Sequence, residues 1–281
     1  MITDQTRIAL ITGASSGIGA GFARKLASLC YNLILVARRE ARLVQLATQL
    51  QQQFNIQAQA LVADLSQSVA VERIERLIAE LPTLELLVNN AGFGVPGKFA
   101  EIPLDKTMAM IDVHVVASTR LTHAALPAMI ARGKGAIINV ASIGGFIPRP
   151  QDTVYCATKA YLISFSEALQ GELADTGVHV QALCPGFVPT EFLDSPEYEQ
   201  LHVKNQIPRW LWSPADAVVA ESLHTLKRDQ VVCIPGFKNR VLVALTRSGL
   251  AGVLLKILAK RLHSPNRKML ALRSLKKETR S

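Results

Sequence analysis

The chain has 281 residues, of which 49 % are hydrophobic and 19 % are charged, and its formal net charge is +9. This length and composition indicate one well-packed α/β domain and exclude a disordered chain. The four cysteines are far apart, form no CxxC pair and follow no secretory signal. We therefore expect a reduced, cytoplasmic protein without disulfides, and no metal site is expected.

The positive charge is confined to the C-terminal part of the sequence. From Lys238 onward there are twelve Lys or Arg and one acid, Glu278, whereas the first 237 residues hold nineteen bases and twenty-one acids. We expect a catalytic domain over 1–237 and a basic amphipathic helical extension over 238–281. The extension either packs on the substrate cleft or a neighbouring subunit, or lies on an anionic membrane surface. Nucleic acid is not expected, because no aromatic residues are interleaved with the bases.

The first strand, Arg7 to Thr12, leads directly into a glycine-rich turn and then a helical pattern that runs to about Leu29. Glycines at such a turn let the backbone approach a pyrophosphate, which the N–H groups at the helix N-terminus then stabilise. An ordinary tight turn is the alternative. The strand before the turn and the helix after it favour a dinucleotide-binding loop over Gly13 to Gly19.

The second strand, Asn32 to Ala37, ends in Arg38 and Arg39. A site for NAD usually places an acid here to bind the ribose 2′-hydroxyl, whereas a 2′-phosphate requires arginine. The nearest acid, Glu40, lies beyond the strand end, so the sequence predicts NADP(H). The alternative is that the two arginines only cover a solvated loop.

Polar and small residues follow the next two strands. Asp64 and Leu65 close the strand Ala58 to Ala63. A carboxylate there either accepts a hydrogen bond from the adenine amino group or caps the following helix. Asn89 to Gly92 follow the strand Leu84 to Val88, and their amides and small side chains suit a floor under the coenzyme.

Three residues form the expected catalytic group: Ser142, Tyr155 and Lys159. Ser142 follows the buried strand Ala136 to Val140, so its hydroxyl belongs at the sheet edge where open α/β sheets bind ligands. On a helix, the i, i+4 spacing of Tyr155 and Lys159 places the ammonium beside the phenol and lowers the phenol pKa. Such a phenol exchanges a proton with a carbonyl or alcohol oxygen. For the pair alone, a surface helix contact is the alternative.

Five motifs, in order, carry a resemblance to a known family. They are TGxxxGIG from Thr12 to Gly19, NNAG from Asn89 to Gly92, Ser142, YxxxK from Tyr155 to Lys159, and Pro185 and Gly186 with Thr190. Over residues 7 to about 237 the chain resembles the common single-domain branch of the short-chain dehydrogenase/reductase family. The resemblance implies a doubly wound Rossmann-type α/β domain with a mainly parallel sheet.

The resemblance also implies roles for individual residues. Tyr155 would be the general acid/base, Lys159 would bind the nicotinamide ribose, and Ser142 would orient the substrate carbonyl. The implied coenzyme contacts are Gly13, Ser15, Ser16, Gly17, Ile18 and Gly19 at the pyrophosphate, Arg38 at the 2′-phosphate, Asp64 and Leu65 at the adenine, Asn90, Ala91 and Gly92 on the adenosine ribose side, and Pro185, Gly186, Val188 and Thr190 at the nicotinamide end.

His114 departs from the family pattern, in which many relatives carry an asparagine that holds a water of the proton relay. Its two ring nitrogens can still donate and accept, so a relay role and a satisfied core histidine both stay open. Relatives often form dimers or tetramers through the helices that carry His114 and Tyr155, so a homo-oligomer is among the expected partners.

Bulky apolar residues crowd the stretch between Pro185 and a helix beginning near Ser213, which indicates a lid over a hydrophobic substrate. Arg149 is interpreted as solvated, and contact with an anionic substrate group is the alternative. The sequence predicts an NADP(H)-dependent oxidoreductase for a hydrophobic ketone or secondary alcohol. The alternative is a non-catalytic NADPH-binding scaffold that docks through its basic extension. The lid residues are Phe187, Phe192, Leu193, Tyr198, Leu201, Ile207, Trp210, Leu211 and Trp212.

Overall fold

The structure is a computed structural model that describes residues 7–194, 198–199, 204 and 207–247. Contacts divide the chain into two compact units, Met1–Asn239 and Arg240–Ser281. The division predicted after residue 237 stays a prediction, because most of the second unit lies outside the described residues.

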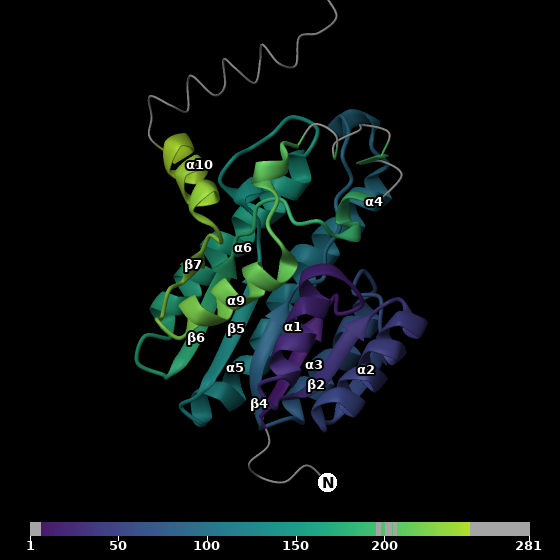
Figure 1. Cartoon of the computed structure of the whole chain (residues 1–281), viewed down its shortest axis with the longest axis vertical. Coiled ribbons are helices and arrows are strands. Elements are labelled where there is room, and N and C mark those ends of the chain that lie inside the picture. Colours follow the sequence, from purple (N-terminus) through teal and green to yellow (C-terminus); the bar gives the residue numbers. More distant parts are fainter. Residues whose placement is uncertain (1–6, 195–197, 200–203, 205–206, 248–281) are drawn as a thin grey trace, which may run out of the picture. The chain divides into compact units, whose positions relative to one another are not determined.

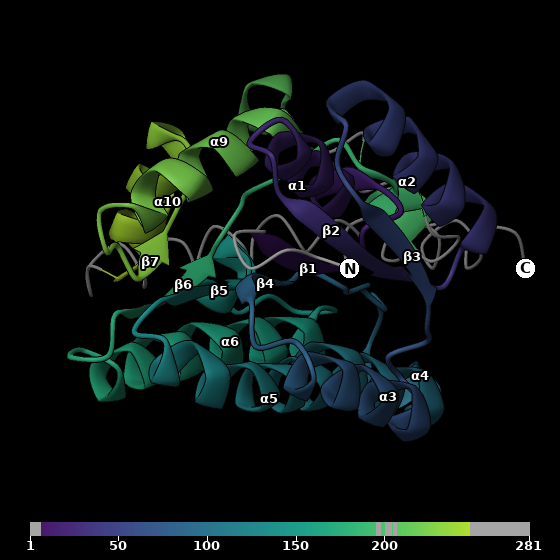
Figure 2. The same cartoon turned by 90° about the horizontal axis from the view of Figure 1, so that it is seen from below.

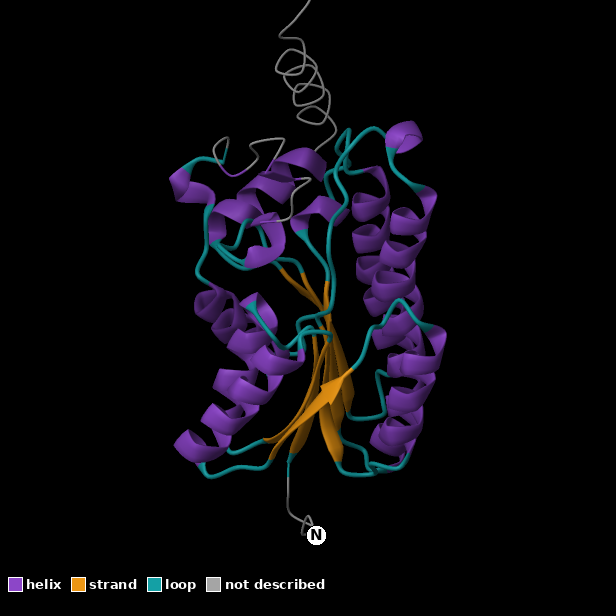
Figure 3. Cartoon of the chain, turned by 90° about the vertical axis from the view of Figure 1, so that its right-hand side faces the viewer, coloured by secondary structure: helices purple, strands orange, loops and turns teal. Residues whose placement is uncertain are grey.

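A seven-stranded parallel sheet forms the centre of the first unit, in the order β3-β2-β1-β4-β5-β6-β7. The central strands are largely buried and mostly apolar because helices cover both faces of the sheet, and Figure 3 shows it between two helical layers. The doubly wound fold class predicted from the sequence is confirmed. The strands are β1 (Ile8–Thr12), β2 (Asn32–Ala37), β3 (Ala58–Val62), β4 (Leu84–Asn89), β5 (Gly135–Val140), β6 (Val178–Leu183) and β7 (Val232–Cys233).

The helices divide between the two faces of the sheet (Figure 2). One face is covered by α1 (Gly17–Ala27), α2 (Glu40–Phe54) and α9 (Ala215–Leu226), which bury residues such as Phe22 and Leu43 against the strands. The other face carries α3 (Ser68–Ala79), α5 (Ser118–Ala131) and α6 (Thr153–Glu172). Figure 1 shows α1 beside α9, and these two helices are in contact.

Several shorter elements complete the described part of the chain. A π-helical segment, Asp112–Ala117, joins α4 (Leu104–Ile111) to α5. The 3-10 turns are Phe99–Glu101, Ile143–Gly145, Glu191–Asp194 and Arg209–Leu211, and α10 is Phe237–Arg247.

The strand order reverses between β1 and β4, so the connections after these two strands leave toward opposite faces. In open α/β sheets this switch point forms a crevice outside the carboxyl ends of the strands, where ligands bind. The glycine-rich loop follows β1 and the NNAG segment follows β4. The fold therefore brings together motifs that lie some 75 residues apart in the sequence.

The predicted element boundaries are correct to within a few residues. The first helix ends at Ala27 and not near Leu29, and the third strand ends at Val62 and not at Ala63. The apolar run Val241 to Lys260 is described only as far as Arg247, in α10. The described residues contain no helix that is both long and apolar enough to cross a membrane. Attachment of the basic extension to a membrane surface stays a prediction.

Candidate active site

Hydrogen bonds tie the glycine-rich loop to the NNAG segment across the switch point. The Thr12 hydroxyl accepts hydrogen bonds from the backbone N–H of Asn90 (2.9 Å) and of Ala91 (3.0 Å). The Asn90 amide donates back to the Thr12 carbonyl at 2.9 Å. Loops from β1 and β4 therefore form one rigid floor, as the predicted position of Asn90, Ala91 and Gly92 requires.

The backbone of the loop requires glycine at several positions, of which Gly17 and Gly19 are the clearest. Gly17 has φ +56°, and a Cβ there would lie 2.9 Å from Thr190 Cγ2. A Cβ on Gly19 would lie 2.3 Å from the carbonyl oxygen of Gly13, closer than any real contact. The backbone is thus held open at the N-terminus of α1, where a side chain would otherwise block a pyrophosphate.

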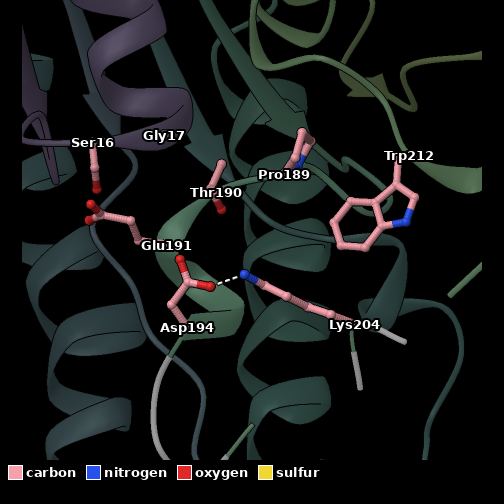
Figure 4. Close-up of a pocket in the computed structure, with 8 residues that line it drawn as sticks. All are labelled: Ser16, Gly17, Pro189, Thr190, Glu191, Asp194, Lys204 and Trp212. Carbon is pink, nitrogen blue, oxygen red and sulfur yellow. Dashed lines mark hydrogen bonds and ion pairs between the residues drawn. The ribbon is translucent and has the colours of Figure 1, made fainter. Parts of the chain in front are cut away.

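A cavity of about 550 Å³ opens beside this loop (Figure 4). Two of the predicted pyrophosphate residues, Ser16 and Gly17, face Thr190 of the loop after β6 across it. The glycine cradle and the adjoining cavity fit a dinucleotide. The three side chains predicted to be catalytic, Ser142, Tyr155 and Lys159, do not line this cavity, which adjoins the predicted coenzyme loop. Its lining is Ser16, Gly17, Pro189, Thr190, Glu191, Asp194, Lys204 and Trp212.

Arg39, which the sequence reasoning did not assign to the coenzyme, contacts the glycine-rich loop directly. Its guanidinium donates to the hydroxyls of Ser15 (3.0 Å) and Ser16 (2.7 Å). It also pairs with Glu191 at 2.5 Å, and Glu191 forms a second ion pair with Arg42. The side-chain hydrogen bonds of both arginines hold the pKa of Glu191 at about 2. The adjacent pair Arg38 and Arg39 was the sequence signal for an arginine at this position. No sequence feature indicated that Glu191 is the ion-pair partner of Arg39.

The other predicted adenosine residues lie at the ends of β2 and β3. Arg38 is exposed directly after β2. Asp64 accepts hydrogen bonds from the backbone N–H (3.0 Å) and the hydroxyl (2.9 Å) of Ser66, and Leu65 is buried. Gln67, and not Asp64, is the N-cap residue of α3. The adenine contact predicted for Asp64 stays a prediction.

Ser142 and Tyr155 meet at the end of β5. Ser142 begins the 3-10 turn after the strand, and Tyr155 lies in the first turn of α6. Burial raises the pKa of Tyr155 to about 12, although a hydrogen bond with Ser142 and the charge of Arg149 act to lower it. The expectation that the phenol pKa is lowered is therefore wrong, because desolvation outweighs both opposing effects.

Lys159 lies beneath the Tyr155 ring, as the i, i+4 spacing predicts. Its Nζ is 5.7 Å from the ring centroid and donates to the Val140 carbonyl at 2.8 Å. The residue is 5 % exposed, and burial lowers the pKa of Lys159 to about 8. Among the described residues the ammonium donates to one acceptor, the Val140 carbonyl, so it keeps donors for a ligand hydroxyl, which is the role the resemblance implies for it.

His114 is fully buried and both of its ring nitrogens have protein partners. Nε2 accepts the backbone N–H of Phe93 at 3.1 Å, so Nδ1 carries the proton and donates to Thr158 Oγ1 at 2.9 Å. Desolvation and the charge of Lys159 hold the pKa of His114 well below its usual value, so the ring is neutral. This geometry matches the core-histidine alternative, and the relay role stays a prediction.

The predicted nicotinamide residues follow β6. The carbonyl of Pro185 accepts the backbone N–H of Ile143 at 3.0 Å, which joins this loop to the turn that carries Ser142. Gly186 packs against Asn239, Val188 is buried, and Thr190 contacts Gly17. These contacts place the loop after β6 opposite the glycine-rich loop.

Aromatic side chains from the segment after β6 continue from Tyr155. The ring of Phe192 is 5.6 Å from that of Tyr155 and also 5.6 Å from that of Tyr198. Phe187 and Trp212 form a second pair at 6.0 Å. Leu201, which was also expected in the lid, lies outside the described residues. In the described part of the chain, no group of three or more His, Cys, Asp or Glu is placed to bind a metal.

This fold and this arrangement of residues define a class of nucleotide-dependent oxidoreductase, and comparison with known proteins identifies the family. Residues 7–200 match the family model described as short chain dehydrogenase. The chain belongs to the short-chain dehydrogenase family. The recognition from sequence motifs is thereby confirmed.

Several known proteins are similar to the chain. An uncharacterised oxidoreductase of Staphylococcus saprophyticus is 36 % identical over 191 residues, which cover 68 % of this chain and 82 % of that protein. The very-long-chain 3-oxoacyl-CoA reductase of Rattus norvegicus is 34 % identical over 202 residues, which cover 68 % of this chain and 64 % of that protein. The structure of a short-chain dehydrogenase from Sphingobium yanoikuyae in complex with NADPH is 31 % identical in sequence and has a TM-score of 0.76. The match covers 93 % of this chain and 96 % of that one. The chain is thus an oxidoreductase that uses a nucleotide cofactor and acts on small molecules.

Proposed function

We propose that the protein is an NADP(H)-dependent oxidoreductase that reduces a hydrophobic ketone, or oxidises the corresponding secondary alcohol. The observation that carries this proposal is the convergence of Ser142, Tyr155 and Lys159 at the carboxyl end of β5, beside a glycine cradle on β1. When bound, the coenzyme supplies the hydride. The chain's own residues bind the substrate, orient it and move a proton.

The preference for NADP(H) is supported by three arginines at the end of β2 and the start of α2. Arg38 is exposed there, while Arg39 and Arg42 already hold a carboxylate, that of Glu191. A guanidinium binds a phosphate in the same forked geometry as a carboxylate. NAD would bring no group of that charge to this position.

The proton step is assigned to Tyr155, with Ser142 holding the same substrate oxygen. The phenol of Tyr155 is protonated at neutral pH, because burial places its pKa at about 12. It therefore begins ketone reduction as the acid. The ammonium of Lys159 beside the ring stabilises the phenolate that forms when the proton leaves.

A hydrophobic substrate is supported by the aromatic residues that continue from Tyr155. Phe192 and Tyr198 extend the ring contacts away from the phenol, and both come from the segment after β6. Such a wall excludes water from the reacting carbonyl and binds an apolar chain or ring.

The test is oxidation of NADPH and of NADH, followed across a panel of medium-chain, aromatic and steroidal ketones. Tyr155→Phe should reduce turnover by about 10²–10⁴-fold, the usual contribution of a general acid. Tyr161→Phe is the matched control, because Tyr161 lies on the same helix, is exposed, and contacts Thr119. Tight NADPH binding without turnover of any ketone would favour the scaffold alternative.

A further inference from the structure

Arg149 and Asp152 form an ion pair in the connection between β5 and α6. Arg149 Nη2 is 2.9 Å from Asp152 Oδ2. Asp152 is the N-cap residue of α6, and its backbone carbonyl accepts the N–H of Cys156 at 2.9 Å. Its side chain makes no capping hydrogen bond. The carboxylate instead holds the guanidinium at the first turn of α6, the turn that carries Tyr155.

The guanidinium of Arg149 lies beside the phenol of Tyr155, and Gly144 borders both groups. A Cβ built on Gly144 would lie 3.4 Å from Tyr155 Cε1 and 3.8 Å from Arg149 Nη2. The Cε1 atom is bonded to the ring carbon that carries the hydroxyl. Because Tyr155 is only 9 % exposed, little water screens a charge at this distance.

Asp152 engages one edge of the Arg149 guanidinium only. The Nε atom is enclosed but has no hydrogen-bond partner among the described residues, so the pair is not the two-pronged contact of which arginine is capable. The sequence interpretation of Arg149 as solvated is wrong in this respect. The remaining positive charge acts on Tyr155, where it lowers the phenol pKa against the larger effect of burial.

Several other groups face the phenol of Tyr155 from the elements packed around it. The ammonium of Lys159 is a second cation, whereas charge on Asp152 or Cys156 acts in the opposite direction. The ring of His114 is neutral and lies 5.9 Å from the phenol ring. The groups are Ser142 after β5, His114 in the π-helical segment, Asp152, Cys156 and Lys159 at the start of α6, and Phe192 and Tyr198 after β6.

The two cations beside Tyr155 differ in the pH range over which they are charged. Burial lowers the pKa of Lys159 to about 8, so its ammonium is lost on the alkaline side of neutrality. A guanidinium cannot be deprotonated in a protein. Oxidation of an alcohol needs the phenolate as the base, and the phenolate forms as the pH rises. Arg149 is therefore the cation that remains where the phenolate forms.

We propose, resting on the reductase function above, that Arg149 is a positioning residue whose permanent charge stabilises the phenolate of Tyr155. Asp152 holds the guanidinium in place and offsets part of its charge. The ion pair thereby sets, together with Lys159, how readily Tyr155 gives up its proton. Removing the charge of either member should shift that equilibrium, and the two shifts should have opposite signs.

The first experiment follows the ionisation of Tyr155 directly, in the full-length protein without coenzyme. The chain has four tyrosines, so tyrosine labelled with carbon-13 at Cζ gives four NMR signals, and the signal lost in Tyr155→Phe is that of Tyr155. Asp152→Asn should lower the titration midpoint by about 0.5–1 pH unit from the wild-type value of about 12. Arg149→Met should raise the midpoint, which appears as a smaller ionised fraction at the highest pH reached.

Arg149→Lys separates the permanent charge from the ion pair. A lysine at this position can still pair with Asp152 at neutral pH, so the fold is kept if Arg149→Met proves unstable. A lysine ammonium is, however, largely deprotonated below about pH 12. The midpoint of Tyr155 in Arg149→Lys should therefore also rise. Lys98→Met and Glu101→Gln are the matched controls, because these residues form an exposed ion pair of the same i, i+3 spacing, and neither should move the midpoint.

The second experiment measures the pH profile of kcat for oxidation of the secondary alcohol that corresponds to the best ketone of the panel above. The profile should shift to lower pH in Asp152→Asn and to higher pH in Arg149→Met. A general loss of packing would lower kcat in both variants without moving the two profiles in opposite directions.

NMR midpoints that are unchanged in the variants, or that move in the same direction in Asp152→Asn and Arg149→Met, overturn the role of Arg149 and leave the reductase function intact. Kinetic profiles that do not follow the NMR midpoints also overturn it. Opposite NMR shifts in a protein that reduces no ketone of the panel would remove the proposed function, while the action of Arg149 on Tyr155 would stand.

Discussion

Glu191, from the loop after β6, forms an ion pair with Arg39 at the start of the β2–α2 connection, with 2.5 Å between Oε2 and Nη1. A second pair joins Glu191 to Arg42. The carboxylate thus crosses the coenzyme side of the site and occupies the guanidinium groups that a 2′-phosphate would use. Under the proposed function, the 2′-phosphate of NADP(H) and Glu191 would compete for the same positive charge.

Glu191→Gln should therefore strengthen NADPH binding while leaving NADH binding nearly unchanged. The side chains of Glu191, Arg39 and Arg42 are about half exposed, so the gain in NADPH affinity is modest. We expect Kd to fall about 2- to 5-fold, the range of exposed ion pairs. Titration of each coenzyme at low ionic strength measures it. Glu101→Gln is the matched control, because it breaks an exposed ion pair, with Lys98, that does not line the cavity beside the glycine-rich loop. A weaker NADPH complex in Glu191→Gln would contradict the competition.

His114 should contribute to stability and its pH dependence, with no step of its own in the activity profile near neutrality. Its ring is neutral in the folded protein, because burial holds its pKa well below 6.5. In the unfolded chain the ring binds a proton as the pH falls through about 6.5. The unfolded state then holds more protons, so stability is lost below that pH by up to about 1.4 kcal/mol per pH unit.

Denaturant unfolding at several pH values tests this effect. His114→Asn should remove the acid-side loss. It should also cost about 1–3 kcal/mol at pH 7, because asparagine cannot reach both Phe93 N and Thr158 Oγ1. Turnover should persist, since no ring nitrogen of His114 is left to contact the reacting groups. His123→Asn, at an exposed position of α5, is the control. An activity step near pH 6.5 that disappears in His114→Asn would instead support the relay role.

Much of the fold could be predicted because its signals are local. In β2 the residues from Leu33 to Ala37 form a continuous apolar run. The glycines after β1 stand where the backbone leaves no room for a side chain. Pairings between distant residues have no such signal: Arg39 and Glu191 are 152 residues apart. The sign of the Tyr155 pKa shift was also missed, because burial depends on side chains from several elements packing around the phenol.

Gly19→Ala and Gly171→Ala should have opposite effects, although both place a methyl group on a helix. At Gly19 the Cβ would lie 2.3 Å from the Gly13 carbonyl, so the coenzyme loop must shift. We expect NADPH binding to weaken at least about 10-fold, the cost of losing one good contact to the phosphates. At Gly171, in α6, nothing lies within 4 Å of the new Cβ.

Gly171→Ala should therefore raise the free energy of unfolding by about 0.5–1 kcal/mol, because alanine has less freedom than glycine in the unfolded chain. Coenzyme titration and denaturant unfolding, run on both variants, measure the two effects. Equal coenzyme affinity in Gly19→Ala and the wild-type protein would show that this loop does not hold the pyrophosphate.

Lys159→Met should be more stable than the wild-type protein at pH 7, although it loses activity. Burial lowers the pKa of Lys159 from 10.5 to about 8 in the folded protein, so below pH 8 the folded state holds a desolvated charge. Between pH 8 and 10.5 the unfolded chain binds a proton that the folded protein has released. The stability of the wild-type protein therefore rises through this window relative to the variant, by about 3 kcal/mol in total.

The difference in unfolding free energy between Lys159→Met and the wild-type protein, measured from pH 7 to 10.5, gives this effect directly. It should be greatest below pH 8 and should shrink as the pH approaches 10.5. Lys25→Met, at an exposed position of α1, should show no such trend. A difference that stays constant over the whole range would mean that the hydrogen bond to the Val140 carbonyl fully offsets the desolvation of the ammonium.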